Sequence, residues 1–353
     1  MSQFLGIGMT HYPLLAGTDE HMAGLLRWTL ADPGIPDREK DPAHWPATMR
    51  EEWGDDQGRS AAAGHRAKLL AGLARCREAL DEFAPDVVVV WGDDQYENFR
   101  EEVVPPFCVL AYDDLEVPAF EVMNERGSPN AWGLPEDFRI TLRGDAATAR
   151  ELTDGLVHDG VDMAYSYRKR EGAHFPHAIL NTQLFLDYDH AGARFPYPLL
   201  PVTVNCYGQH AIARKGGLAR FADIADEKPD PSGPSPARCM EVGAAIARHF
   251  AHRDQRVAFV ASSSWSHAFL TDALWHIRPD TDADERLYRL MTGERYDELA
   301  AVTGRQVVEA GQHEILNWFC LFGAVREVGL ELRWSTLVAT DVFNSNKPFA
   351  VYR

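Results

Sequence analysis

The chain has 353 residues, of which 45% are hydrophobic, 25% charged and 10% aromatic, a composition typical of a globular enzyme. Its 53 acidic and 35 basic residues give a formal net charge of −18, which argues against nucleic acid and anionic membranes as partners. The five cysteines are scattered and lack CxxC spacing, and the N-terminus lacks the basic region of a secretory signal. We therefore expect a cytoplasmic protein with reduced thiols.

The first half of the chain begins with an apolar run at 4–9 that predicts a strand. Residues 31–60 are rich in proline and charge, which predicts a loop insertion with little regular structure. Leucines at helical spacing predict a helix from about Ala61 to Phe83. The run Val87–Trp91, mostly β-branched, predicts a strand that is buried on both faces.

The second half continues the alternation of helices and strands. The patterns predict helices at 146–158, 240–252 and about 296–328, strands at 199–205 and 257–261, and a helix or strand at 178–186. A second, turn-rich insertion at 207–238 is expected to form a rim or lid. The alternation predicts a single α/β domain over 1–353, with a central, mostly parallel sheet flanked by helices.

Polar side chains follow three of the predicted strands, where packing does not require them. They are His11, the Asp93–Gln95 loop and the pair Ser266–His267, and the ends of parallel strands lie along one edge of a sheet. Glu314 lies in an apolar stretch, where a carboxylate is costly unless a cation pairs with it. Each residue also has a structural explanation, such as a buried hydrogen bond, a salt bridge or a helix cap. The residues alone therefore indicate a candidate metal site.

Six motifs occur in the order of a known family: GMTHYPLL, VVVVWGDDQYENF followed by PPF, GAHFPHAIL, LPVTVN, SSSWSHAF and GQHEILNW. Together they resemble the LigB-type class III extradiol dioxygenases, the family of the catalytic β subunit of protocatechuate 4,5-dioxygenase. The resemblance covers about residues 4–325, interrupted by the two insertions. It implies a LigB-like fold.

The resemblance also implies roles for individual residues. His11 and Glu314 would bind Fe(II), His267 would be the acid/base for the substrate hydroxyl, and His174 a further active-site histidine. The residues expected to contact the substrate are Tyr12, Asp94, Tyr96, His177 and Ser266.

Position 95 departs from the family pattern, because Gln95 stands where the second histidine ligand is expected. Fe(II) oxygenases of this type use two imidazoles and one carboxylate, and a carboxamide oxygen is a weaker donor. We expect Gln95 to ligate or face the metal, with weaker Fe(II) binding or another divalent metal. Asp94 or His65 could supply the ligand instead, or the site could hold no metal.

The resulting prediction is a non-haem Fe(II) dioxygenase that opens a catechol-type or aminophenol-type ring with O₂. Two alternatives remain: a metal-dependent hydrolase on the same scaffold, and a non-catalytic binding homologue. The expected partners are a small aromatic substrate, O₂ and other copies of the chain in a homo-oligomer. The insertion at 207–238, a neighbouring subunit or a small companion subunit would cover the site.

Overall fold

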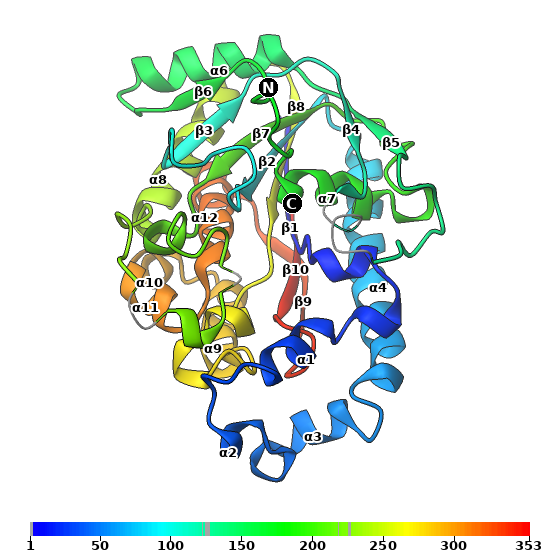
Figure 1. Ribbon diagram of the computed structural model, residues 1–353. Coiled ribbons are helices and arrows are strands. Elements are labelled where there is room, and N and C mark those ends of the chain that lie inside the picture. Colours follow the sequence, from blue (N-terminus) through cyan, green and yellow to red (C-terminus); the bar gives the residue numbers. More distant parts are fainter. Residues whose placement is uncertain (1–2, 122, 124–127, 218, 225–226) are drawn as a thin grey trace.

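The computed structural model describes residues 3–121, 123, 128–217, 219–224 and 227–353, and its centre is an eight-stranded sheet (Figure 1). The four central strands are parallel to one another, whereas the strands β10 and β9 extend the sheet in antiparallel fashion and β3 is antiparallel to β7. In spatial order the strands are β6 (Ala164–Ser166), β3 (Phe107–Leu110), β7 (Leu199–Val204), β2 (Val87–Asp93), β8 (Arg256–Ser262), β1 (Gln3–Met9), β10 (Lys347–Tyr352) and β9 (Leu332–Val338). The predicted fold class, one α/β domain with a mostly parallel sheet flanked by helices, is confirmed.

Helices cover both faces of this sheet. The helices α4 (Arg59–Phe83) and α7 (His177–Leu186) lie on one face, and α8 (Pro236–Ala251) and α12 (Leu316–Val328) on the other (Figure 1). Strand β2 serves both layers, because Val88 and Val90 pack with the first pair of helices, while Val87, Val89 and Trp91 pack with the second. Within the described part of the chain, no helix has the length and apolar character that crossing a bilayer requires.

The other elements are smaller. Strands β4 (Leu115–Pro118) and β5 (Arg139–Leu142) form a separate antiparallel pair. The remaining helices are α1 (Gly24–Leu30), α2 (Asp37–Lys40), α3 (Ala47–Trp53), α6 (Ala146–His158), α9 (Thr281–Thr292), α10 (Tyr296–Ala300) and α11 (Gly304–Glu309).

Most predicted elements are present within a few residues, and 178–186 is helical, but two predictions were wrong. The segment 31–60 contains α2, α3 and a one-turn 3₁₀ helix rather than irregular loop. The long final helix is divided into α10, α11, a 3₁₀ turn at His313–Ile315 and α12. A capping box at Thr303 starts α11 anew, and Gly311 has a φ of +63°, which a helix cannot contain.

The two helices α8 and α12 cross with their backbones in contact. A Cβ added to Gly243 would lie 1.8 Å from the carbonyl oxygen of Cys320, and one added to Gly323 would lie 2.0 Å from that of Met240. Both positions therefore need glycine for lack of space. This crossing sets how closely α12, whose first turn adjoins the candidate site, can approach the sheet.

Candidate metal centre

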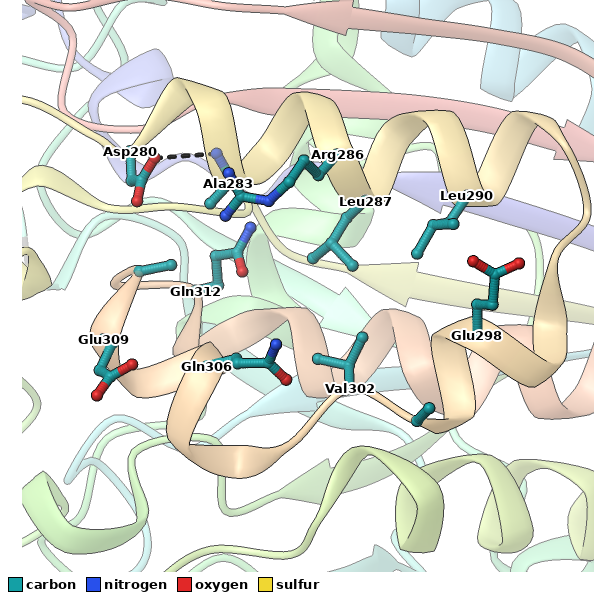
Figure 2. A pocket seen from close by; sticks show the side chains of 12 residues that line it. Asp280, Ala283, Arg286, Leu287, Leu290, Glu298, Val302, Gln306, Glu309 and Gln312 are labelled. Carbon is teal, nitrogen blue, oxygen red and sulfur yellow. Dashed lines mark hydrogen bonds between the residues drawn. The ribbon is translucent and has the colours of Figure 1, made fainter.

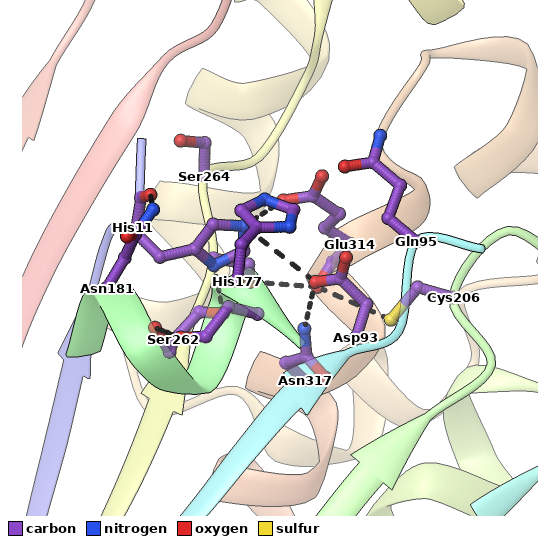
Figure 3. A network of polar contacts seen from close by, with 12 residues as sticks. His11, Asp93, Gln95, His177, Asn181, Cys206, Ser262, Ser264, Glu314 and Asn317 are labelled. Atoms are coloured by element: carbon purple, nitrogen blue, oxygen red, sulfur yellow. Dashed lines mark hydrogen bonds and ion pairs between the residues drawn. The ribbon is translucent and has the colours of Figure 1, made fainter. Parts of the chain in front are cut away.

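The ends of the central strands bring polar side chains from distant parts of the chain together (Figure 3). His11 follows β1, Asp93 ends β2, and Glu314 comes from the 3₁₀ turn before α12. Nε2 of His11 lies 3.4 Å from Oε2 of Glu314 and 3.9 Å from Oδ1 of Asp93. Each of the three residues offers one ligand atom, and these atoms lie within 4.8 Å of one another, as a single bound metal ion requires.

The hydrogen bonds of the histidines leave lone pairs facing this group. Nδ1 of His11 lies 2.7 Å from the carbonyl oxygen of Ser262, and Nδ1 of His267 lies 2.8 Å from that of Trp265. A carbonyl oxygen only accepts, so both Nδ1 atoms carry the proton and both Nε2 atoms are free to bind. Nε2 of His267 lies 3.3 Å from Oε2 of Glu314. When Glu314 is ionised, several acceptor atoms thus converge with no hydrogen between them, which a cation would resolve.

The two carboxylates are held in place but not fully satisfied. The Tyr207 hydroxyl donates to Oε1 of Glu314 at 2.7 Å, and the Asn317 amide donates to Oδ1 of Asp93 at 3.3 Å. Oε2 of Glu314 and Oδ2 of Asp93 are buried, and neither has a hydrogen-bond donor among the described residues. Burial raises the pKa of Asp93 to about 6 and that of Glu314 well above its usual value. The charge of Glu97 adds to the pKa shift of Asp93, and the charge of Asp93 adds to that of Glu314.

His177 adds a positive charge to the edge of the group. Its ring lies edge-on to that of His11, with centroids 4.9 Å apart, and its Nδ1 lies 2.9 Å from Oε1 of Glu97. Burial opposes the imidazolium, yet the charges of Glu97, Asp93 and Glu314 raise the pKa of His177 to about 9. By contrast, burial lowers the pKa of His267 to about 3 and that of His11 well below its usual value. His11 and His267 are therefore neutral at pH 7.

Gln95 is not brought into the group. Its side-chain amide donates to the carbonyl oxygen of Gly216 in the second insertion, and Figure 3 shows its side chain apart from His11, on the far side of Glu314. The neighbouring Asp94 accepts the backbone N–H groups of Glu97, Asn98 and Phe99, so its carboxylate closes a turn. Burial raises the pKa of Asp94 to about 7 despite these bonds.

The other predicted site residues have the following contacts. Nδ1 of His174 lies 2.8 Å from a carboxylate oxygen of Glu121. The Tyr12 ring is buried under the ammonium of Lys347, 3.9 Å from the ring centroid, and the Tyr96 hydroxyl donates to Glu101. Ser266 is buried beside His267 and donates to the carbonyl oxygen of Ala310, and His65 packs against Phe343 and Tyr12.

The group is closed off from solvent. The exposed fractions are 2% for His11, 0% for Asp93, 2% for Glu314 and 5% for His267. The second insertion contributes to the enclosure through the Gln95–Gly216 bond and through Arg214, which bridges Glu227 and Asp272. The side chains therefore lie in a low-dielectric environment, where charges interact strongly.

The sequence-based reasoning did not identify Asp93 as a candidate ligand. It also did not identify the residues that hold the group in place: Asn317 beside Asp93, Tyr207 beside Glu314 and Glu97 beside His177. A signal for Asp93 was present in the alternation of β2. Asp93 has the same parity as Val87, Val89 and Trp91, so it faces the α12 layer from which Glu314 and Asn317 come. Tyr207, Glu97 and Asn317 carried no comparable signal, because their proximity arises only from the tertiary structure.

The fold and this group define an α/β protein with a candidate divalent-metal site at the carboxyl ends of its parallel strands. Residues 231–350, which include His267 and Glu314, match the family model described as the catalytic LigB subunit of aromatic ring-opening dioxygenase. The chain thus resembles the LigB-type ring-opening dioxygenases, as predicted.

Curated relatives support the same resemblance at low identity. The chain is 26% identical over 204 residues to a 2,3-dihydroxyphenylpropionate/2,3-dihydroxicinnamic acid 1,2-dioxygenase of Rhodococcus globerulus, covering 57% of this chain and 50% of that protein. It is 26% identical over 230 residues to the Comamonas testosteroni enzyme of the same name, covering 64% and 56%. The chain spans about half the length of the curated relatives it matches.

A solved structure of an uncharacterized protein from Escherichia coli K12 is similar with a TM-score of 0.46 and 12% identity, covering 80% of this chain and 91% of that one. This likeness is too distant to support an assignment.

Proposed function

We propose that this protein is an extradiol dioxygenase that opens a catechol-type or aminophenol-type aromatic ring with O₂. Its metal would be Fe(II), or another divalent ion, held by His11, Asp93 and Glu314. The observation that carries the proposal is the convergence of their acceptor atoms, with Nε2 of the neutral His267 beside them. The resemblance to LigB-type dioxygenases supports the reaction class.

The donor set suits a divalent first-row metal. Imidazole nitrogen and carboxylate oxygens bind Fe(II) and its neighbours in the first transition series. The buried oxygens of Glu314 and Asp93, which have no hydrogen-bond donors among the described residues, fit the same role. When bound, the metal would polarise the substrate oxygens and bring them into contact with O₂. The Ser262 carbonyl fixes the His11 ring, and Tyr207 fixes Glu314, as supporting residues commonly do at metal sites.

The chain's own residues would move the proton. Nε2 of His267 is available to take the hydroxyl proton of the substrate, because its Nδ1–H is bonded to the Trp265 carbonyl. The His177 imidazolium beside His11 offers positive charge to the resulting oxyanion. Burial of the site keeps water away from the opening ring. Both atoms of O₂ enter the product as the ring carbon–carbon bond next to the diol breaks.

Asp93 and Gln95 give a direct test of the third ligand. Asp93→Asn is expected to weaken Fe(II) binding by at least about 100-fold, since it removes a charged donor from the group. Gln95→Ala is expected to change the affinity less than about threefold, because its amide bonds to Gly216. Anaerobic titration of the chelator-treated variants with Fe(II) measures both affinities. Strong loss in Gln95→Ala with normal binding in Asp93→Asn would assign the third ligand to Gln95.

His267→Gln is expected to lower O₂ uptake with catechol or 2,3-dihydroxyphenylpropionate by about 10²- to 10⁴-fold, because glutamine cannot accept the proton. Iron content and melting temperature should stay near those of the wild type. His158→Gln, at an exposed position on α6, is the matched control and should leave uptake unchanged. More than a tenth of wild-type uptake in His267→Gln would rule out His267 as the main base.

The same assay separates the proposal from its alternatives. A ring-opening dioxygenase consumes one O₂ for each ring opened and incorporates label from ¹⁸O₂. A hydrolase on this scaffold would form product without O₂, and a binding homologue would bind the aromatic without forming product.

A further inference from the structure

Asp284, in the first turn of α9, is a completely buried carboxylate that collects hydrogen bonds from three separate segments. The backbone N–H of Ser266 lies 3.1 Å from both of its oxygens. The Gln312 side-chain amide donates to Oδ1 at 2.6 Å, and that of Asn346 donates to Oδ2 at 2.8 Å. Among the described residues, no lysine or arginine forms an ion pair with Asp284. The carboxylate is therefore stabilised by N–H dipoles alone.

Two of the three segments carry residues of the candidate metal centre. Ser266 precedes His267, and Gln312 lies two residues before Glu314. The three segments are also joined to one another by backbone hydrogen bonds. The His267 N–H donates to the Gly311 carbonyl, and the Asn346 N–H donates to the Ser266 carbonyl. Asp284 is thus the common acceptor for the backbone that carries the proposed base and for the backbone that carries a proposed ligand.

A cleft borders this junction. It has a volume of about 550 Å³, lies between α9 and the segment of α10 and α11, and its lining includes Asp280, Ala283 and Gln312 (Figure 2). Gln312 itself is only 3% exposed, so its bond to Asp284 is buried. This bond joins the Gln312 side chain to α9, and a buried polar network is rigid only when every member is satisfied.

We propose that Asp284 is a positioning residue that fixes His267 and Glu314 relative to each other through Ser266 and Gln312. This inference rests on the proposed function for the importance of those two side chains, but not for the geometry itself. Within the part of the chain that the structure describes, Asp284 forms no hydrogen bond or ion pair with the side chains of His11, Asp93, His267 or Glu314, so it acts through the segments that it joins.

The test compares Asp284→Asn with Asp280→Asn, the matched change at the N-cap of the same helix, where the side chain accepts a hydrogen bond from the Ala283 N–H. Asp284→Asn keeps the shape but turns an N–H₂ group toward other donors. We expect it to weaken Co(II) binding by about 10- to 100-fold and to shift the ring ¹³C–¹H signal of His267 in metal-free protein. Asp280→Asn should lower only the melting temperature. Gln312→Met, which removes one donor, should weaken Co(II) binding while leaving the His267 signal in place, and it serves as the test if Asp284→Asn does not fold.

Wild-type Co(II) affinity and an unshifted His267 signal in Asp284→Asn would overturn the inference, as would a lowered melting temperature alone, matching Asp280→Asn. If the wild type binds no Co(II), the proposed function fails. The His267 signal, which needs no metal, then still decides whether Asp284 positions this histidine.

Discussion

Glu314→Gln is expected to abolish metal binding and, at the same time, to make the metal-free protein more stable. In the metal-free wild type, Oε2 of Glu314 faces the lone pairs of His11 and His267 at 3.4 and 3.3 Å. A glutamine amide at this place donates hydrogen bonds to them instead. Satisfying such a buried group is worth about 1–3 kcal/mol, so we expect the free energy of unfolding at pH 8 to rise by roughly that amount.

The difference in the free energy of unfolding between Glu314→Gln and the wild type should depend on pH with a defined sign. The pKa of Glu314 is raised in the folded protein, so the folded state keeps a proton that the unfolded chain releases above about pH 4.5. The wild type therefore loses stability relative to Glu314→Gln as pH rises from about 4.5 toward the folded pKa. Denaturant titrations of chelator-treated proteins at several pH values measure the difference. A Glu314→Gln variant that is less stable than the wild type at pH 8 would contradict this account.

Adding metal should make the wild type more stable than Glu314→Gln, the reverse of the order expected without metal. A metal that binds only the folded wild type stabilises it by mass action, whereas Glu314→Gln should show no response. The comparison with and without metal is the control, because it separates loss of the proposed metal ligand from a general change in folding.

Gly323→Ala is expected to destabilise the fold strongly. Its Cβ would lie 2.0 Å from the carbonyl oxygen of Met240, a backbone atom that cannot move without separating α8 from α12. Overpacking of this kind costs about 3 kcal/mol or more, which corresponds to about 4 °C in melting temperature for a chain of this size. Because α12 follows directly on Glu314, metal affinity should fall as well.

The chain offers a matched control for this change at Gly64. It is exposed in the second turn of α4, and a Cβ there meets no atom within 4 Å. Gly64→Ala should stabilise the protein by about 0.8–1 kcal/mol through helix propensity. Equal melting temperatures for Gly323→Ala and the wild type would show that the two helices can separate at little cost.

The sequence predicted helices and strands best where the local residue pattern favours one kind of secondary structure. The β-branched run of β2 and the leucine spacing of α4 each have one favourable structure, whatever their surroundings. Strands β9 and β10 were not predicted, and the break at Gly311 was not either. Gly311 turns because its carbonyl must meet the His267 N–H, a contact between segments 44 residues apart that no local pattern encodes.

The residues of the candidate site were predicted only in part, because contacts between distant segments also decide which side chains meet there. His11, His267 and Glu314 stand out in the sequence as polar residues in apolar surroundings, and they do lie together in the structure. The roles of His174 and Gln95 came from the resemblance alone, and their observed contacts are with Glu121 and Gly216. At Gln95 the motif departs from the pattern of the family it resembles. There the candidate ligand Asp93 can be found only from the alternation of side chains along β2 and from tertiary contacts.

Under the proposed function, the enclosure of the candidate metal centre would have a kinetic consequence. Since His267 is only 5% exposed and Gln95 is bonded to Gly216, an aromatic substrate would reach the centre only when the contacts at Gly216 and Arg214 open. The rates of substrate association and product release would then be set by the frequency of that opening rather than by diffusion. Turnover would be sensitive to solvent viscosity and to the Arg214 bridge, and the enclosure would protect the bound metal from oxidation between turnovers.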